Sequence, residues 1–437
     1  MTDTSIEKSS APGDAGPPES WPAEVPELDL LFFETVSTPE GRQNPYARYR
    51  ALREAAPVYK SGMGMYVCTR YAECQFALRD PRFGKDEGNR DEQLKERFGH
   101  LDIFPSIAEA IADRRSLLFM NPPDHTRLRS LVSKAFTPRT VERLRPEIVT
   151  LVDDLLDALP EGEVVDVMEA LAYRLPVAVI SKMLGVPPSD WAHFREVMGR
   201  VTVLLEPFIA DDEIGPAFAG QAELEEYFHH LVAARRQDPG DDLLSGLIAV
   251  QEGSDRLSEL ELISTVMLLC GAGFETTTNL IGNGLLALLQ HPHEMARLRA
   301  DHGKDGSVMR SAVEELLRYD SPVQFDGRST FETIDLGGIP VPAGSEVITV
   351  LGAANRDPSH WKNPDELDLR RDEGPPMSFA SGIHFCLGAS LARAEGQVVF
   401  DRLLDRFSSI ELATDSPQFR NRITLRGLSK LPVVFGT

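Results

Sequence analysis

Apolar residues recur at helical spacing through most of the chain between residues 124 and 320. This period predicts helices over 144–159, 167–184, 224–235 and 257–290. The last of these would run about 32 residues, or roughly 48 Å at 1.5 Å per residue. A helix of that length must cross the whole molecule. Ser258 and Glu261 have the spacing of a capping box at its start.

Outside this region the pattern changes. A short helix is predicted over 45–56, followed by partial alternation typical of strands at 58–60 and 65–68. After residue 320 one helix is predicted at 389–404, together with three β segments at 334–341, 346–350 and 431–435. We therefore expect a mainly α protein with a minor β region. Residues 1–28 are expected to form a disordered, acidic, Pro-rich tail, and 29–437 one large domain.

Charge and composition narrow the class of protein. The formal net charge is -23, with 68 acidic against 45 basic residues. This balance disfavours nucleic acid as a partner, because phosphate binding needs a basic field. The longest apolar stretch, Leu262–Phe274, is shorter than the roughly 20 residues of a membrane span. With four cysteines and no CxxC pair, we expect a cytoplasmic protein without disulfides or a membrane span.

Cys386 lies between two glycines, just before the helix predicted at 389–404. The positive end of a helix and its free N–H groups stabilise a thiolate. Gly382 and Gly388 would let the backbone approach a flat group and adopt unusual φ values. On chemistry alone, a small buried apolar cysteine is an equal alternative.

The centre of the long predicted helix is unusual. Residues 272–277 read Ala-Gly-Phe-Glu-Thr-Thr, and glycine alone costs a helix about 1 kcal/mol against alanine. Glu275 would be expensive in an apolar helix unless it is paired or functional. A purely structural alternative is that the threonine hydroxyls bond carbonyls four residues earlier and bend the helix.

Both segments resemble the cytochrome P450 family. The haem-binding signature of that family matches at Phe379, Gly382, His384, Cys386 and Gly388. The resemblance implies the cytochrome P450 fold, with the long central helix over haem b and the Cys386 thiolate on the iron, which favours O–O cleavage. It assigns Glu275 and Thr276 to proton delivery. It also places Ala272 and Gly388 against the cofactor.

The resemblance extends to residues that hold the haem propionates and the fold. Two propionates need cationic donors. The family positions correspond here to His125, Arg129, Arg328 and His384. A structural Glu-x-x-Arg pair and its downstream arginine correspond to Glu315, Arg318 and Arg371, with Leu367 where the family commonly has Phe.

The function implied is monooxygenation, the hydroxylation or epoxidation of an apolar small molecule with O2. A haem sensor and a helical protein without haem are the alternatives, and Glu275 with Thr276 favours the enzyme. The chain is too short and too poor in cysteine for an attached reductase, so electrons must come from a separate protein. The resemblance implies a ferredoxin served by an NAD(P)H-dependent ferredoxin reductase. The basic candidates for its docking, against an alternative of scattered surface charge, are Arg127, Lys134, Arg139, Arg143 and Arg393.

Motif positions also suggest the substrate pocket. Its candidate residues are mostly apolar: Leu268, Ala272, Val323, Gln324, Phe325 and Leu428. Residues 101–107 and 203–208 are expected to form a mobile roof. His291 and His293 resemble a metal site superficially, but Pro292 fits the first turn of a new helix instead.

Overall fold

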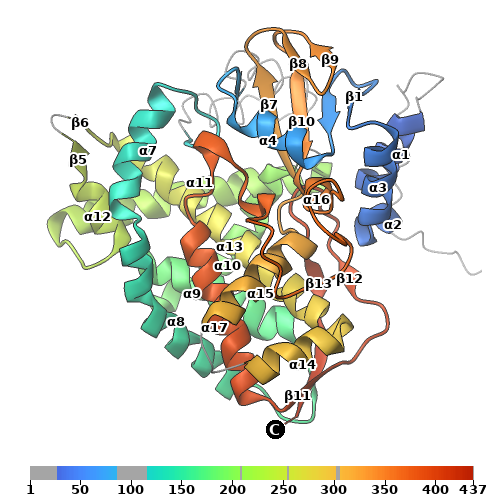
Figure 1. Ribbon diagram of the computed structural model, residues 1–437. Helices are drawn as coiled ribbons and strands as arrows, with labels where there is room; N and C mark the ends of the chain where they lie inside the picture. Colours follow the sequence, from blue (N-terminus) through green and yellow to red (C-terminus); the bar gives the residue numbers. More distant parts are fainter. Residues whose placement is uncertain (1–26, 86–115, 207–208, 253–254, 302–305, 437) are drawn as a thin grey trace, which may run out of the picture.

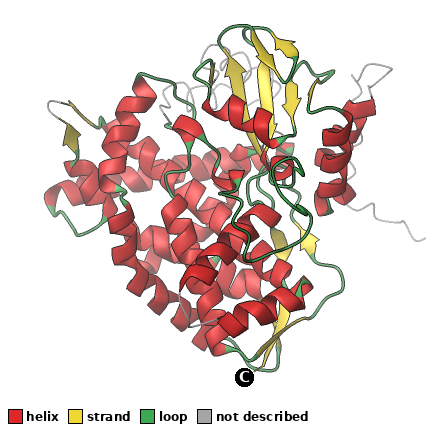
Figure 2. Cartoon of the chain, in the orientation of Figure 1, coloured by secondary structure: helices red, strands yellow, loops and turns green. Residues whose placement is uncertain are grey.

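The structure is a computed structural model that describes residues 27–85, 116–206, 209–252, 255–301 and 306–436. Helices make up most of it, and the largest sheet lies at one end of the helical body (Figures 1 and 2). The expectation of a mainly α protein with a minor β region is confirmed. The helices of the main body are α7 (Asp124–Ala135), α8 (Pro138–Asp157), α9 (Arg174–Met183), α10 (Trp191–Val201), α11 (Asp211–Gln237), α13 (Glu259–Gln290), α14 (Pro292–Asp301), α15 (Gly306–Tyr319) and α17 (Ala389–Arg406).

Helix α13 is the centre of the core. It packs against α9, α11, α15 and α17, and most of its second half is buried. The predicted capping box is confirmed, since the Ser258 hydroxyl accepts the N–H of Glu261 and the Glu261 carboxylate accepts the N–H of Ser258. This helix is long and apolar enough to cross a membrane. Its apolar composition is explained by its place in the protein interior, where neighbouring helices cover it.

Five strands form the main sheet in the order β1-β2-β10-β7-β3. Only β2 and β10 run parallel; the other pairs are antiparallel. In the register of β7 and β10, Arg328 lies opposite Val347. The strands are β1 (Val58–Lys60), β2 (Tyr66–Cys68), β3 (Phe83–Gly84), β7 (Phe325–Thr330) and β10 (Glu346–Val350).

Shorter strands pair at the edges of the helical body. One small sheet has the order β11-β14-β4, and three two-stranded pairs are β5-β6, β8-β9 and β12-β13. Their bounds are β4 (Val164–Asp166), β5 (Gln251–Glu252), β6 (Asp255–Arg256), β8 (Ile334–Leu336), β9 (Ile339–Val341), β11 (Ser409–Leu412), β12 (Gln418–Phe419), β13 (Leu428–Lys430) and β14 (Pro432–Gly436). The remaining helical elements are α1 (Glu27–Ser37), α2 (Pro39–Gln43), α3 (Tyr46–Ala55), α4 (Tyr71–Arg79), α12 (Leu243–Ala249) and α16 (Leu351–Ala354), with single turns η1 (Met168–Ala172), η2 (Pro188–Asp190), η3 (Thr202–Leu205), η4 (Met377–Phe379) and η5 (Gly382–His384).

Several predicted boundaries were wrong. Helix α8 begins at Pro138 and α11 at Asp211, both earlier than their apolar periodicity indicated. The helix expected over 167–184 is divided into η1 and α9. The segment 334–341 is two strands, because Gly337 and Gly338 turn the chain with positive φ between β8 and β9. Helices α1, α2 and α4 were missed.

A buried ion-pair network fixes the connection that leads to the cysteine loop. Arg318 on α15 holds Glu315 through Nε and Nη2, at 2.6 and 2.8 Å from the two carboxylate oxygens. The Nε of Arg371 lies 3.0 Å from Oε2 of the same carboxylate. Arg318 also donates to the carbonyls of Asn355 and Pro364. The structure thus brings together the three residues expected to act as a unit.

Arg318→Leu is expected to lower the free energy of unfolding by about 3 kcal/mol or more, because it leaves a buried carboxylate with one cation fewer. Urea denaturation monitored by far-UV circular dichroism measures this. The control is Lys182→Met, which removes an exposed pair with Glu147 and should cost less than about 1 kcal/mol. Equal costs for the two variants would contradict a structural role for the network.

Candidate active site

The cysteine loop holds its sulfur at the start of α17. The Cys386 N–H donates to the carbonyl of Phe379 at 3.0 Å. Burial raises the pKa of the Cys386 thiol, while the backbone N–H groups of Gly388 and Ala389 and the guanidinium groups of Arg129 and Arg393 work against that rise. The sulfur is therefore surrounded by groups that favour its anion, as a metal ligand requires.

The two glycines of the loop serve different purposes. Gly382 has φ +72°, and a Cβ there would lie 2.2 Å from the carbonyl oxygen of Leu78 in α4. Gly388 has an ordinary φ of -83°, so the expectation of an unusual φ there was wrong. A Cβ at Gly388 would instead lie 4.0 Å from the Cys386 sulfur. Gly382 permits the close approach to α4, and Gly388 leaves room beside the Cys386 sulfur.

A cluster of basic side chains lies beside the loop. His125 comes from α7 and His384 from η5, and their ring centroids are 4.3 Å apart. Arg129 extends from α7 to the carbonyl of Phe385, at 2.6 Å. Arg328 comes from β7, and its Nη1 donates to Asp326 at 2.6 Å. The structure thus gathers the candidate propionate residues from three elements around the cysteine loop.

Several nitrogen atoms of this cluster have no hydrogen-bond partner among the described residues. They are both ring nitrogens of His125, Nε2 of His384 and Nη2 of Arg328. Burial, together with the charges of Arg328, His125 and Lys85, lowers the pKa of His384 to about 3. Buried donors and excess positive charge at one place call for an anionic ligand. The carboxylates of a haem fit this requirement.

The middle of α13 presents two faces. Ala272 is exposed and Thr276 half-buried, one turn apart, and the Thr276 hydroxyl donates to the Ala272 carbonyl at 2.7 Å. Glu275 is 2% exposed. The backbone hydrogen bond expected from a purely structural threonine is therefore present, and it leaves the hydroxyl oxygen free to accept a second bond.

Glu275 has a partner that sequence reasoning missed. Nη1 of Arg420, in the turn between β12 and β13, lies 2.7 Å from its Oε1. Arg420 also donates to Asn279, one turn further along α13. The Arg420 side chain is 21% exposed, so the pair connects a buried acid to the protein surface. No motif indicates Arg420, because the contact joins segments far apart in the sequence.

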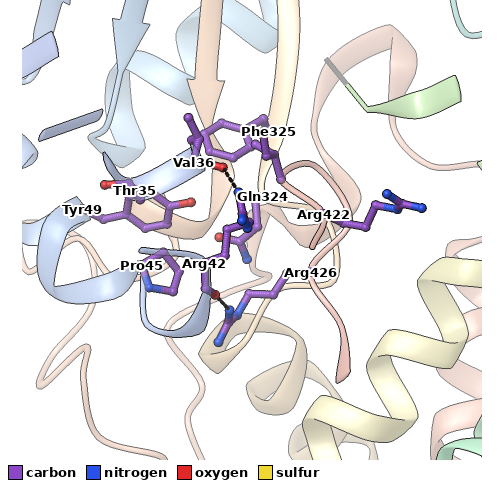
Figure 3. A pocket seen from close by; sticks show the side chains of 10 residues that line it. Thr35, Val36, Arg42, Pro45, Tyr49, Gln324, Phe325, Arg422 and Arg426 are labelled. Carbon is purple, nitrogen blue, oxygen red and sulfur yellow. Dashed lines mark hydrogen bonds between the residues drawn. The ribbon is translucent and has the colours of Figure 1, made fainter. Parts of the chain in front are cut away.

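The candidate pocket residues do not all lie together. Leu268 and Ala272 share α13, Val323 pairs with Leu425 in an isolated bridge, and Leu428 is fully buried beside Gly282. Gln324 and Phe325 belong to another pocket, which Figure 3 shows. It is lined by Thr35, Val36, Arg42, Pro45, Tyr49, Gln324, Phe325, Arg422, Ile423 and Arg426.

The packing explains the different direction of these two side chains. Gln324 donates to the Ser321 carbonyl at 2.6 Å, and Phe325 makes edge contacts with Phe32 and Tyr49 of the N-terminal helices. Gln324 and Phe325 were expected to line the substrate pocket with Leu268 and Leu428, but these contacts hold their side chains elsewhere. Of the expected roof, 101–107 lies outside the described residues, as do 207 and 208, whereas Thr202–Leu205 forms η3.

Two of the five basic docking candidates are committed to ion pairs. Arg127 binds Asp255 and Glu261, and Arg393 binds Glu314 at 3.0 Å through Nη2. Both guanidinium groups are half-buried against carboxylates, so neither presents a fully exposed charge for docking. The other three candidates, Lys134, Arg139 and Arg143, are exposed. Arg139 and Arg143 lie near the start of α8.

The site so described has a cysteine sulfur beside groups that favour its anion, a cluster of buried basic side chains with unpartnered nitrogens among the described residues, and an acid and a hydroxyl on the central helix. These features define the class of haem-thiolate proteins. Comparison with known proteins agrees with that class. The cytochrome P450 family profile matches residues 90–432.

Individual relatives extend the match over nearly the whole chain. The chain is 42% identical over 419 residues to "Cytochrome P450 107B1" of Saccharopolyspora erythraea, which covers 94% of this chain and 98% of that protein. It is 41% identical over 401 residues to "Vitamin D(3) 25-hydroxylase" of Pseudonocardia autotrophica, covering 90% and 94%. The solved structure of the cytochrome P450 PksS of Bacillus subtilis 168 has TM-score 0.80 and 37% identity, covering 92% and 99%. The chain belongs to the cytochrome P450 family of haem-thiolate monooxygenases.

Proposed function

We propose that the chain holds haem b through the Cys386 thiolate and inserts one oxygen atom of O2 into an apolar small molecule. The main observation behind this proposal is the group of buried nitrogens on His125, His384 and Arg328, beside the cysteine loop, that have no hydrogen-bond partner in the described part of the chain. When bound, the haem supplies oxygen activation, which the thiolate promotes. His125, Arg129, Arg328 and His384 would hold the propionates.

Glu275 and Thr276 would manage the protons that the reaction consumes. The Thr276 hydroxyl donates to Ala272, so its oxygen can accept a bond from a water and hold that water in place. Glu275 is buried, and its ion pair with Arg420 leads toward the surface. We assign Glu275 to proton supply and Thr276 to holding the last proton donor.

The substrate proposal rests on the apolar candidates Leu268, Ala272, Val323 and Leu428. Relatives favour the same class of molecule. One is named a vitamin D(3) hydroxylase, and one solved structure, of CYP267B1, contains myristic acid, at TM-score 0.82 and 38% identity. Apolar side chains with few polar groups are typical of sites for such ligands. We therefore propose a lipid-like substrate that is hydroxylated or epoxidised.

We propose that electrons arrive from a ferredoxin and an NAD(P)H-dependent reductase in the cytoplasm. The candidate dock is the cysteine loop with the start of α8. Ile383 and Phe385 are 48% and 40% exposed on that loop. Helix α8 packs along α17, and Arg139 and Arg143 are exposed near its start. An apolar centre with basic neighbours suits an acidic partner.

Cys386→Ser is expected to abolish the strongly red-shifted Soret band of the ferrous carbon monoxide complex, because that band depends on sulfur ligation. The optical spectrum of the reduced, carbon monoxide-treated protein measures it. Replacing Cys68, Cys74 or Cys270, which are buried and free, should leave the band intact. A Cys386→Ser protein that keeps the band refutes the assigned ligand.

Thr276→Ala is expected to separate oxygen activation from haem binding. Haem content and the carbon monoxide spectrum should survive, and NAD(P)H should still be consumed, but hydrogen peroxide should replace hydroxylated product. Loss of a positioned proton-transfer group costs about a hundredfold to ten-thousandfold in the step it serves. Product and peroxide formed per NAD(P)H are the measured quantities.

The matched control is Thr278→Ala. Thr278 makes the same kind of bond to a carbonyl four residues earlier, that of Phe274, but it is fully buried. This variant should stay coupled. Glu275→Gln should instead slow the whole cycle, because proton supply is reduced. If Thr276→Ala forms as much product per NAD(P)H as the wild type, the hydroxyl has only a structural role in the helix.

Arg139→Glu and Arg143→Glu are expected to slow turnover when ferredoxin is limiting. The deficit should shrink as salt is added, since exposed charges are screened beyond about 8 Å at physiological ionic strength. Lys430→Glu, at an exposed position on β13, is the charge-matched control. Peroxide-driven turnover should not change. Wild-type rates in both arginine variants at low salt would exclude this dock.

A further inference from the structure

Lys85 is held beside the cluster of His125, Arg328 and His384, although no sequence motif includes it. It follows β3, which pairs with β7. Its backbone N–H donates to Oδ1 of Asn121 at 2.8 Å, and its carbonyl accepts from Nδ2 of Asn121 at 2.7 Å. This pair of bonds holds the Lys85 backbone. Its ammonium group then lies 2.7 Å from Oδ1 of Asp326 and 2.9 Å from the carbonyl of Gly327.

Arg328 uses the same two acceptors. Its Nη1 donates to Oδ1 of Asp326 at 2.6 Å and to the carbonyl of Gly327 at 2.8 Å. Its Nη2 is buried and has no partner among the described residues. Two cations therefore share one carboxylate oxygen and one carbonyl, and one edge of the Arg328 guanidinium is fixed while the other is available.

The number of charges matters at this place. Burial works to raise the pKa of Asp326, but Lys85 and Arg328 outweigh it and hold that pKa below its usual value. Asp326 is therefore an anion at neutral pH. Arg328 and Asp326 alone would form a neutral pair, which has little net attraction for another anion. Burial lowers the pKa of Lys85, and the Asp326 carboxylate acts against that fall. Protonated Lys85 gives the group a net positive charge beside His125 and His384.

We propose that Lys85 and Asp326 are positioning residues for the cofactor. Asp326 fixes the Nη1 edge of Arg328 so that its Nη2 edge meets a haem propionate, and Lys85 restores the positive charge that Asp326 cancels. The inference rests on the proposed function, because it needs a haem whose carboxylates lie at this cluster. It adds that this group of three charges sets the electrostatic potential at the iron.

The two residues have opposite charges, so their removal has opposite effects. Adding one electron to the iron makes the site more negative, and a nearby cation favours that state. Lys85→Met should lower the midpoint reduction potential, and Asp326→Asn should raise it. The double variant should return toward the wild-type value. A general loss of structure would move all three in one direction.

Potentials are measured by dithionite titration of the haem-loaded protein, and haem retention by transfer to apomyoglobin. Lys85→Met should release haem roughly tenfold faster than wild type, because a buried charge-assisted contact is weakened. Lys85→Arg should restore both properties. The control is Lys182→Met, which removes the same charge from an exposed pair and should change neither.

The outcomes separate this inference from the proposed function. A wild-type protein without haem or without the thiolate spectrum refutes the proposed function. Variants that keep this spectrum but match Lys182→Met in potential and in haem release overturn the positioning role alone. Shifts of equal sign in Lys85→Met and Asp326→Asn also overturn it. Asp326→Asn and Lys85→Arg keep the test decisive should Lys85→Met not fold.

Discussion

The proposed site depends on one requirement, that the Cys386 sulfur be held as an anion inside the protein. Burial alone opposes this, since it raises the pKa of Cys386. The N–H groups at the start of α17 and the charges of Arg129 and Arg393 act against burial. Arg393 also binds Glu314 on α15 and lies 4.4 Å from the Phe379 ring, so the group that favours the anion also fixes the loop to the core.

A second constraint is the placing of positive charge in an acidic chain. The net charge is -23, yet the cluster beside the cysteine loop places the cations Arg328 and Lys85 next to His125 and His384, whose pKa values are lowered. Such a cluster is costly unless anions complete it. The unpartnered nitrogens there show that protein groups do not complete it within the described residues. These unpartnered nitrogens would be available to an anionic cofactor.

The central helix shows that a structural and a chemical role can coexist. Thr276 satisfies its donor on the carbonyl of Ala272, which keeps the helix intact, and its oxygen can still accept. Glu275 is stabilised by Arg420 from a distant turn. The unfavourable residues at this point of α13 are therefore compensated by tertiary contacts, which is expected where function displaces helix propensity.

The sequence by itself determined what depends on neighbouring residues: the long central helix with its cap at Ser258, the class of fold, and the motif that identifies the family. Such features follow from periodicity and local hydrogen bonding. Only the tertiary structure decided which remote side chains meet. The pairing of Arg420 with Glu275, the bond of Lys85 to Asp326 and the turning of Phe325 toward the N-terminal helices each join distant segments. Which partner a side chain meets is decided by tertiary packing between distant segments, and no local pattern encodes that packing.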